Sequence, residues 1–170
     1  MIHLLDKILA RALVVLMAAM VADVTWQIFT RFVTNSPASW SEELARFLLI
    51  WIGLLGAAWA YRARAHLGLS YFVEKFEEDT QRKLAIVSYL SSALFAVTVM
   101  VYGGSQLVLL TLELNQVSAS LGVKIGYVYS IIPISGALIT IYALDFTRAA
   151  MQGEHYIHPH LRDDAEEEEK

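Results

Sequence analysis

Four long apolar segments, separated by short polar stretches, dominate the sequence. They cover about residues 8–32, 44–61, 84–112 and 125–144. The third contains 29 consecutive residues without Asp, Glu, Lys, Arg or His, and an uncharged apolar run of about 18 or more residues is typical of a membrane-crossing helix. The second has only 15 residues between Arg46 and Arg62, but these long side chains can reach the headgroups on both sides. The pattern predicts an all-α membrane protein with four transmembrane helices.

Residues 39–44 form a polar start to the second apolar segment. Their sequence Ser39-Trp40-Ser41-Glu42 fits a capping box, in which Ser39 is the N-cap and the Glu42 side chain bonds back to it. Tryptophan also favours the membrane–water interface. We therefore expect a short interfacial helix over residues 39–44 that bends into the second span.

Residues 67–80 alternate apolar and charged positions with a helical period. The apolar positions on one face are Leu69, Phe72, Val73 and Phe76. This pattern is typical of an amphipathic helix that lies on the membrane surface. Residues 149–170 are polar and acidic, so we expect a flexible tail after a membrane domain formed by residues 1–148.

The third and fourth segments carry features that predict irregular helices. The third would be about 44 Å long at about 1.5 Å per residue, so we expect it to tilt or protrude from a hydrocarbon core of about 30 Å. Gly103 and Gly104 are candidates for a bend within it. In the fourth segment, Pro133 lacks the N–H that would bond the Tyr129 carbonyl, which predicts a kink.

Small residues recur in the second segment at three- and four-residue spacing. They are Gly53, Gly56, Ala57 and Ala60. Small side chains at this spacing allow the backbone of another membrane helix to approach closely. We therefore expect a helix-packing face on this span.

Composition agrees with a membrane protein and excludes several other classes. The chain is 56% hydrophobic and 18% charged, whereas soluble domains are about 45–50% apolar and about 25% charged. It has no cysteine, which excludes disulfides and thiolate metal sites. The net charge is −4 and no basic stripe is present, so nothing indicates a nucleic-acid partner.

Basic residues are distributed unequally between the two sides of the predicted membrane domain. With the N-terminus inside, ten of the 13 Lys and Arg residues fall on the inner side. The three on the outer side are Arg31, Arg46 and Lys124. The positive-inside rule therefore predicts that both termini are cytoplasmic.

Asp23 is the acidic residue inside the first span. Together with Gln27 and Arg31 it lies on one helix face at i, i+4 and i+8. An intramembrane carboxylate can mark an ion or proton path, but no second acid or histidine occurs at similar depth to complete a relay. We favour a polar seam that packs against another helix, with a standalone proton-coupled carrier using Asp23 as the alternative.

Polar and aromatic residues crowd into the start of the second span. They are Trp40, Glu42, Glu43 and Arg46. This group suits a docking edge for a partner or for lipid headgroups, and it equally suits a helix cap with an interfacial anchor. Both interpretations stay open from the residues alone.

Catalytic and metal-binding motifs are absent from the sequence. It contains no nucleophile elbow, phosphate-binding loop or zinc-helix motif. Three histidines, His155, His158 and His160, fall in the predicted tail, which offers no scaffold for a metal. A membrane-bound enzyme, the other alternative, would need clustered ionisable groups, and the candidates are Arg62, Arg64 and His66. We predict no catalytic residue, no metal site and no cofactor.

A solute pathway is also poorly supported by the residues. Secondary transporters usually show internal repeats, interrupted helices and polar groups near the bilayer midplane. This chain has no visible repeat, one predicted kink and one intramembrane acid. An accessory or scaffold subunit of a larger assembly fits better.

One stretch of the chain is distinctive enough to compare with a known family. It comprises Arg31-x₃-Asn35, Trp40-Ser41-Glu42-Glu43-Leu44-Ala45-Arg46, Trp51, Gly53, Gly56-Ala57-Ala58, Arg62 and His66. The later run is Tyr129-x₃-Pro133-x₂-Gly136. Together these resemble the small membrane subunit, of the DctQ type, of tripartite ATP-independent periplasmic (TRAP) transporters, over nearly the whole chain except the acidic tail.

The resemblance implies partners and a location that the residues alone do not reveal. It implies a large membrane subunit with the substrate and sodium sites, and a periplasmic binding protein that delivers an organic acid such as a C4-dicarboxylate or a sialic acid. It also implies the bacterial inner membrane and a bracing role for the small subunit. The residues expected at an interface with a partner or phospholipid are Arg31, Trp40, Glu42, Glu43, Arg46, Trp51, Gly53, Gly56, Ala57, Ala60, Arg62, His66 and Pro133.

Overall fold

The computed structural model describes residues 2–33, 38–63 and 78–152. Four of its helical stretches are long and apolar enough to cross a membrane. These are His3–Val33, Ser39–Arg62, Thr80–Glu113 and Ile125–Met151. The prediction of an all-α protein with four membrane-spanning segments is therefore confirmed.

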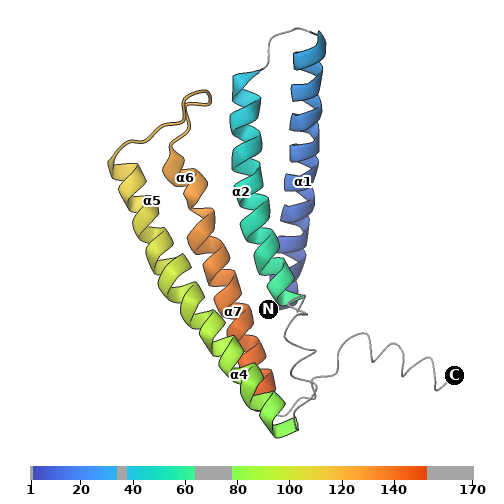
Figure 1. Cartoon of the computed structure of the whole chain (residues 1–170), viewed down its shortest axis with the longest axis vertical. Helices are drawn as coiled ribbons and strands as arrows, with labels where there is room; N and C mark the ends of the chain where they lie inside the picture. The colour runs from blue at the N-terminus through green and yellow to red at the C-terminus, as the bar shows by residue number, and fades with distance from the viewer. Residues whose placement is uncertain (1, 34–37, 64–77, 153–170) are drawn as a thin grey trace, which may run out of the picture.

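The first two spans are single helices and the last two are composite (Figure 1). The first span is α1 (Ile2–Val33) and the second is α2 (Ser39–Arg62). The third consists of α4 (Glu78–Phe95), the π-helix η1 (Ala96–Gly103) and α5 (Gly104–Glu113). The fourth consists of α6 (Ile125–Tyr129) and α7 (Ile131–Met151).

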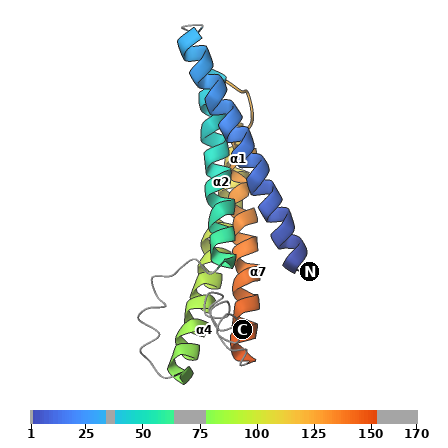
Figure 2. The same ribbon diagram turned by 90° about the vertical axis from the view of Figure 1, so that its right-hand side faces the viewer.

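The helices form a row instead of closing around a common core. α1 packs on α2, α2 packs on α7, and α7 packs on α4 and η1, which is the order across Figure 1. Viewed from the α1 side, α1 crosses α2 at an angle (Figure 2). The α2–α7 contact is therefore the main connection between the first two spans and the last two.

The hydrophobic core lies where α1, α2 and α7 meet. It is built from Leu9 of α1, Leu55 and Ala58 of α2, and Tyr142 and Phe146 of α7. The core is small, because only 11% of the residues in the most apolar window of each of the first three spans are buried within the chain. Most of the apolar surface of these helices consequently faces outward.

Glycines bring the third and fourth spans close together. A Cβ at Gly136 would lie 2.6 Å from the Met100 Cβ, and one at Gly126 would lie 2.6 Å from the Leu112 Cγ. A Cβ at Gly104 would lie 2.8 Å from a side-chain carbon of α7. These distances leave no room for a side chain, so the third and fourth spans form a closely packed hairpin.

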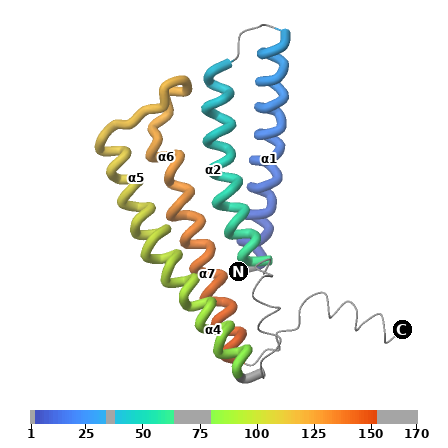
Figure 3. Tube along the Cα trace, viewed as in Figure 1, coloured from blue at the N-terminus to red at the C-terminus, as the bar shows by residue number. Residues whose placement is uncertain are grey.

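The third span contains a π-helix at its middle. The Cα trace of the third span is one continuous helical rod (Figure 3). The sequence suggested a bend at Gly103 and Gly104, but the helix continues through both residues, where the π-helix Ala96–Gly103 ends. Residues five apart are stacked along a π-helix because its hydrogen bonds join i and i+5. Phe95 and Met100 therefore both border the same groove on the protein surface.

The fourth span is divided close to Pro133, where the sequence predicts a kink. The span divides at Ser130, one turn before Pro133, into α6 and α7. The Ser130 N–H still donates to the Gly126 carbonyl at 3.1 Å, and its own carbonyl accepts from Ile134 at 3.3 Å. Backbone hydrogen bonds thus continue across the break.

The predicted capping box at the start of the second span is wrong. Ala38 occupies the N-cap position, and among the described residues no side chain caps the first turn of α2. The hydroxyl of Ser41 instead bonds a carboxylate of α1, so this part of the sequence serves a contact between helices. Residues 39–44 also continue into α2 as one helix, without a separate interfacial segment.

Some predictions fall on residues that the structure does not describe. These are His66, most of the predicted surface helix over residues 67–80, and the tail from residue 153 onward. The surface helix and the acidic tail therefore stay predictions.

We predict opposite effects of alanine at two glycines of the spans. Gly136→Ala places a Cβ against Met100 and the Ala96 carbonyl oxygen, and such overpacking should lower the free energy of unfolding by about 1–3 kcal/mol. The matched control Gly53→Ala meets nothing within 4 Å and improves helix propensity, so stability should be unchanged or raised by up to about 1 kcal/mol. Thermal unfolding of the purified chain in detergent measures both. Equal melting temperatures for the two variants would contradict the described packing.

Candidate functional site

α2 presents one open face along its length. The exposed positions on this face are Glu42, Arg46, Leu49, Gly53 and Ala57. Their spacing of three or four residues places them on one side of a helix. Gly56 and Ala60 lie half-buried beside them, and a Cβ added at Gly53 or Gly56 would meet no atom within 4 Å. The structure thus brings the predicted small residues and two predicted charged residues onto a single face, which we call the open face.

Away from the open face, α2 holds the rest of the chain through polar contacts. The first is at the end of the row that carries the loop of residues 114–124, which we call the loop end. There Glu43, in the first turns of α2, accepts hydrogen bonds at one carboxylate oxygen from the N–H groups of Ser120 at 2.9 Å and Leu121 at 3.0 Å. Hydrogen bonds to a charged acceptor are roughly twice as strong as neutral ones. Glu43 therefore fixes the position of this loop relative to α2.

The second contact supports the interrupted part of the fourth span. The indole Nε1–H of Trp51 donates to the Val128 carbonyl oxygen at 3.0 Å. The next carbonyl along the chain, that of Tyr129, is the one that Pro133 cannot bond. Backbone carbonyls at membrane depth need a donor from within the protein because lipid tails supply none. Trp51 meets this need beside the helix break.

The third contact lies at the opposite end of the row, near Asp6 and Met151, which we call the terminal end. The Arg62 Nε lies 3.2 Å and 3.3 Å from the two carboxylate oxygens of Asp6. The Arg62 guanidinium also lies 5.6 Å from the ring centre of Tyr142 and 5.5 Å from that of Phe146. Cations within about 6 Å of an aromatic ring are attracted to its face. One arginine thus joins α1, α2 and α7.

The internal roles of these residues do not exclude a second role. Glu43, Trp51, Arg62 and Pro133 were predicted at an interface with a partner or lipid, and all four are half-buried. Their contact with a partner stays a prediction. Within the chain, the first three position the open face by fixing α2 against its neighbours.

Asp23 contributes to the packing of α1 on α2. Its Oδ1 accepts a hydrogen bond from the Ser41 hydroxyl at 2.7 Å, and both side chains are buried. Gln27 is half-buried and Arg31 is exposed. The predicted polar seam is therefore confirmed at Asp23, whereas Arg31 faces away from the chain.

Aromatic side chains gather on the outside of the loop end. The residues concerned are Trp26, Phe29, Phe32 and Trp40, all of them exposed. The rings of Trp26 and Phe29 stack with their centres 5.9 Å apart. Aromatic residues of this kind favour the interface between lipid and water.

The partners in these contacts have no local signature in the sequence. Asp6 and Ser41 are ordinary polar residues near helix ends, and the loop N–H groups have no side-chain signature. Each pairing also joins residues that are distant in sequence: 18 positions for Ser41 with Asp23, 56 for Arg62 with Asp6, and 77 for Trp51 with Val128. The local periodicity of one segment carries no information about such pairs.

No metal-binding cluster occurs among residues 2–33, 38–63 and 78–152: these ranges contain no group of three His, Asp or Glu side chains placed to hold an ion. The histidines at positions 155, 158 and 160 lie outside them.

Sequence comparison adds to this picture of a multi-pass membrane protein with one open helix face. Residues 20–153 match the family described as tripartite ATP-independent periplasmic transporters, DctQ component. The chain belongs to this family, and it is accordingly a transporter permease subunit and not an enzyme.

The chain is similar to several members and relatives of this family, three of which are as follows. The sialic acid TRAP transporter small permease protein SiaQ of Vibrio cholerae is 42% identical over 71 residues, which are 42% of this chain and 41% of the relative. The C4-dicarboxylate TRAP transporter small permease protein DctQ of Rhodobacter capsulatus is 26% identical over 125 residues, or 72% of this chain and 55% of that one. The sialic acid TRAP transporter permease protein SiaT of Haemophilus influenzae is 36% identical over 56 residues, which are 33% of this chain but only 9% of SiaT.

We predict that Glu43 protects the loop of residues 114–124 and that its neighbour Glu42 does not. Glu43→Ala removes the acceptor of two N–H groups, so amide hydrogen exchange at Ser120 and Leu121 should become at least about tenfold faster. Glu42→Ala, on the open face, is the matched control and should leave both amides unchanged. Equal exchange in the two variants would show that the loop does not depend on Glu43.

Proposed function

We propose that this chain is the small scaffold subunit of a secondary, sodium-coupled TRAP transporter that imports an organic acid. Its partners would be a large membrane subunit and a periplasmic binding protein. The observation that carries the proposal is the open face of α2, where a Cβ added at either of two glycines in a membrane helix would meet no atom of the described chain within 4 Å.

The shape of the chain supports a subunit that is completed by a partner. A row of helices with a small core leaves most of its apolar surface outside. Lipid can cover such a surface, but lipid gives no reason for glycine in a helix interior, where it costs about 1 kcal/mol relative to alanine. Close approach of another helix does give one, because small residues allow backbones to pack and form contacts along their length.

The distribution of polar groups supports a brace more than a carrier. Asp23 bonds Ser41 near the start of α2, and Asp145 lies in the last turns of α7, toward the opposite end of the row. The standalone proton-coupled carrier would need acids that exchange protons across the membrane, and this separation disfavours it. A rigid support requires polar contacts such as those that α2 makes with α1 and with the fourth span.

The relatives support the choice of partner and substrate class. The match to SiaT occupies 9% of that chain, so a segment like this one occurs within a much larger permease protein. Two relatives are named for sialic acid and one for C4-dicarboxylate, and all of these solutes carry carboxylates. Sodium coupling and the periplasmic binding protein rest on the family resemblance.

We predict that bulk on the open face prevents assembly without unfolding the chain. Gly56→Leu should abolish co-purification with a tagged large subunit, because the branched side chain keeps the partner helix at a distance. Gly56→Ala is the matched control and should retain most of the complex. Both variants should insert and melt at or above the wild-type temperature, since a Cβ added at this position would meet no atom within 4 Å and glycine is a poor helix former.

Two results would contradict the scaffold proposal. One is full assembly of the Gly56→Leu variant together with normal uptake. The other is solute uptake, driven by a sodium or proton gradient, into proteoliposomes that contain only this chain. The second result would favour the standalone carrier.

The proposal includes an orientation in the bacterial inner membrane with both termini in the cytoplasm. It is supported by the excess of Lys and Arg on the predicted inner side, with ten residues against three. The loop of residues 114–124 would then be periplasmic.

Cysteine labelling tests this orientation. Ala119 and Gln152 are both exposed, whereas Ser118 in the same loop is buried and would label poorly in either orientation. In cells with a permeabilised outer membrane, an impermeant thiol reagent should label Ala119→Cys and spare Gln152→Cys. The reverse pattern would place the termini in the periplasm.

A further inference from the structure

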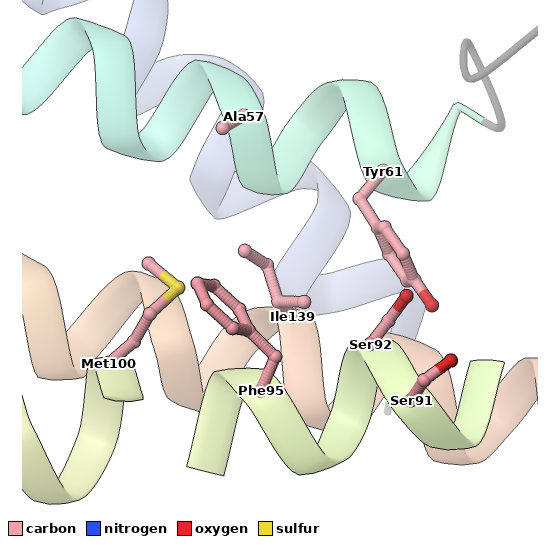
Figure 4. Close-up of a pocket in the computed structure, with 7 residues that line it drawn as sticks. All are labelled: Ala57, Tyr61, Ser91, Ser92, Phe95, Met100 and Ile139. Atoms are coloured by element: carbon pink, nitrogen blue, oxygen red, sulfur yellow. The ribbon is translucent and has the colours of Figure 1, made fainter. Parts of the chain in front are cut away.

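A groove with a volume of about 400 Å³ lies between α2 and the third span (Figure 4). This volume is within the range of about 300–1,000 Å³ that small-molecule sites occupy. Ala57 of α2 and Phe95 and Met100 of the third span line it, with Ile139 of α7 between them. No charged residue is among the lining side chains, and all of them belong to helices that are apolar and long enough to span a membrane. The groove therefore opens toward the bilayer.

The groove is more polar at one end than at the other. Ser91, Ser92 and Tyr61 border one end, whereas Ala57 and Met100 border the other (Figure 4). The polar end lies nearer the start of α4 and thus nearer the terminal end of the row. Both serine hydroxyls donate to carbonyls of their own helix, which leaves oxygen lone pairs free to accept a further hydrogen bond.

Lys83 lies on α4 between the polar end of the groove and the end of the helix. Lys83, Val87 and Ser91 are exposed at i, i+4 and i+8, so they lie along one ridge of α4. Eight residues of helix place the Lys83 backbone about 12 Å from that of Ser91. A flexible lysine side chain reaches back over part of this distance or out to a headgroup phosphate. Along the third span, the Lys83 ammonium, the serine hydroxyls and the apolar part of the groove thus follow one another.

The groove is elongated. From Ser91 to Met100 the third span runs along it for about 13 Å. A single extended hydrocarbon chain is thinner than a helix and suits this space.

We propose that the groove binds one phospholipid from the leaflet at the terminal end. One acyl chain lies against Phe95, Met100 and Ile139, and the glycerol region meets the serine hydroxyls. The phosphate is placed for attraction by the Lys83 ammonium. The bound lipid fills the space between α2 and the third span. This site is separate from the open face, apart from Ala57 at its edge, and does not depend on the scaffold proposal.

Lipid retention by the full chain, purified in detergent, tests the site. Mass spectrometry of the intact protein and of its extracted lipid should find about one phospholipid per wild-type chain. Ser92→Phe fills the groove and should reduce retention at least about tenfold, whereas Leu90→Phe, at an exposed position on the same helix outside the groove, should retain it. Lys83→Gln should reduce retention of anionic phospholipid several-fold.

Several outcomes would overturn the proposal. One is a wild-type chain without phospholipid, and another is equal retention by Ser92→Phe when its helix content and melting temperature match the wild type. If Ser92→Phe does not fold, photocrosslinking from a benzoylphenylalanine placed at position 95 tests the lipid site instead. It should form a phospholipid adduct in detergent that is absent with the same group at position 90, and no adduct at either position would refute the site. Loss of the large subunit from Ser92→Phe with the lipid still bound would assign the groove to the partner and would also overturn the lipid site, while leaving the scaffold proposal intact.

Discussion

The contact between α2 and α7 holds the two halves of this chain together. α1 reaches the rest of the row chiefly through α2, and the third span reaches it through α7. In a soluble protein the hydrophobic effect would drive such helices into a closed bundle. Between helices surrounded by lipid that driving force is absent, so packing and hydrogen bonds decide the arrangement. The Trp51–Val128 bond and the Arg62 cluster supply polar attraction on both sides of this contact, and Glu43 adds a tie at the loop end.

Glycine serves two different purposes in the same membrane domain. At Gly104, Gly126 and Gly136 it removes a side chain where another part of the chain already occupies the space. At Gly53 and Gly56 an added Cβ would meet no atom of the described chain within 4 Å. The first set closes the hairpin of the third and fourth spans. The second set gives the row a side on which a further helix can approach, and this is why a scaffold subunit explains the chain better than a self-sufficient carrier.

A row of helices also leaves gaps that a closed bundle would fill with side chains. The π-helix η1 contributes to the gap beside α2, because it places Phe95 and Met100 on the same side of the third span. A lipid chain in this groove and a partner helix on the open face would cover adjacent surfaces. The small subunit would then be held at a fixed depth by lipid on one side and by protein on the other.

The sequence alone determined the class of this protein and the number of its spans, because the requirement to satisfy backbone hydrogen bonds in lipid allows little besides long apolar helices. The Pro133 interruption and the polar seam at Asp23 were also accessible, since a missing N–H and a helical spacing are local properties. Tertiary structure decided the rest. The stretch Ser39-Trp40-Ser41-Glu42 predicted a cap, but Ser41 bonds Asp23, and Glu43 bonds a loop 77 positions away. Whether a glycine is packed or open depends on which helix lies against it, and in a membrane that choice is made by shape and long-range polar pairs, which have no period along the chain.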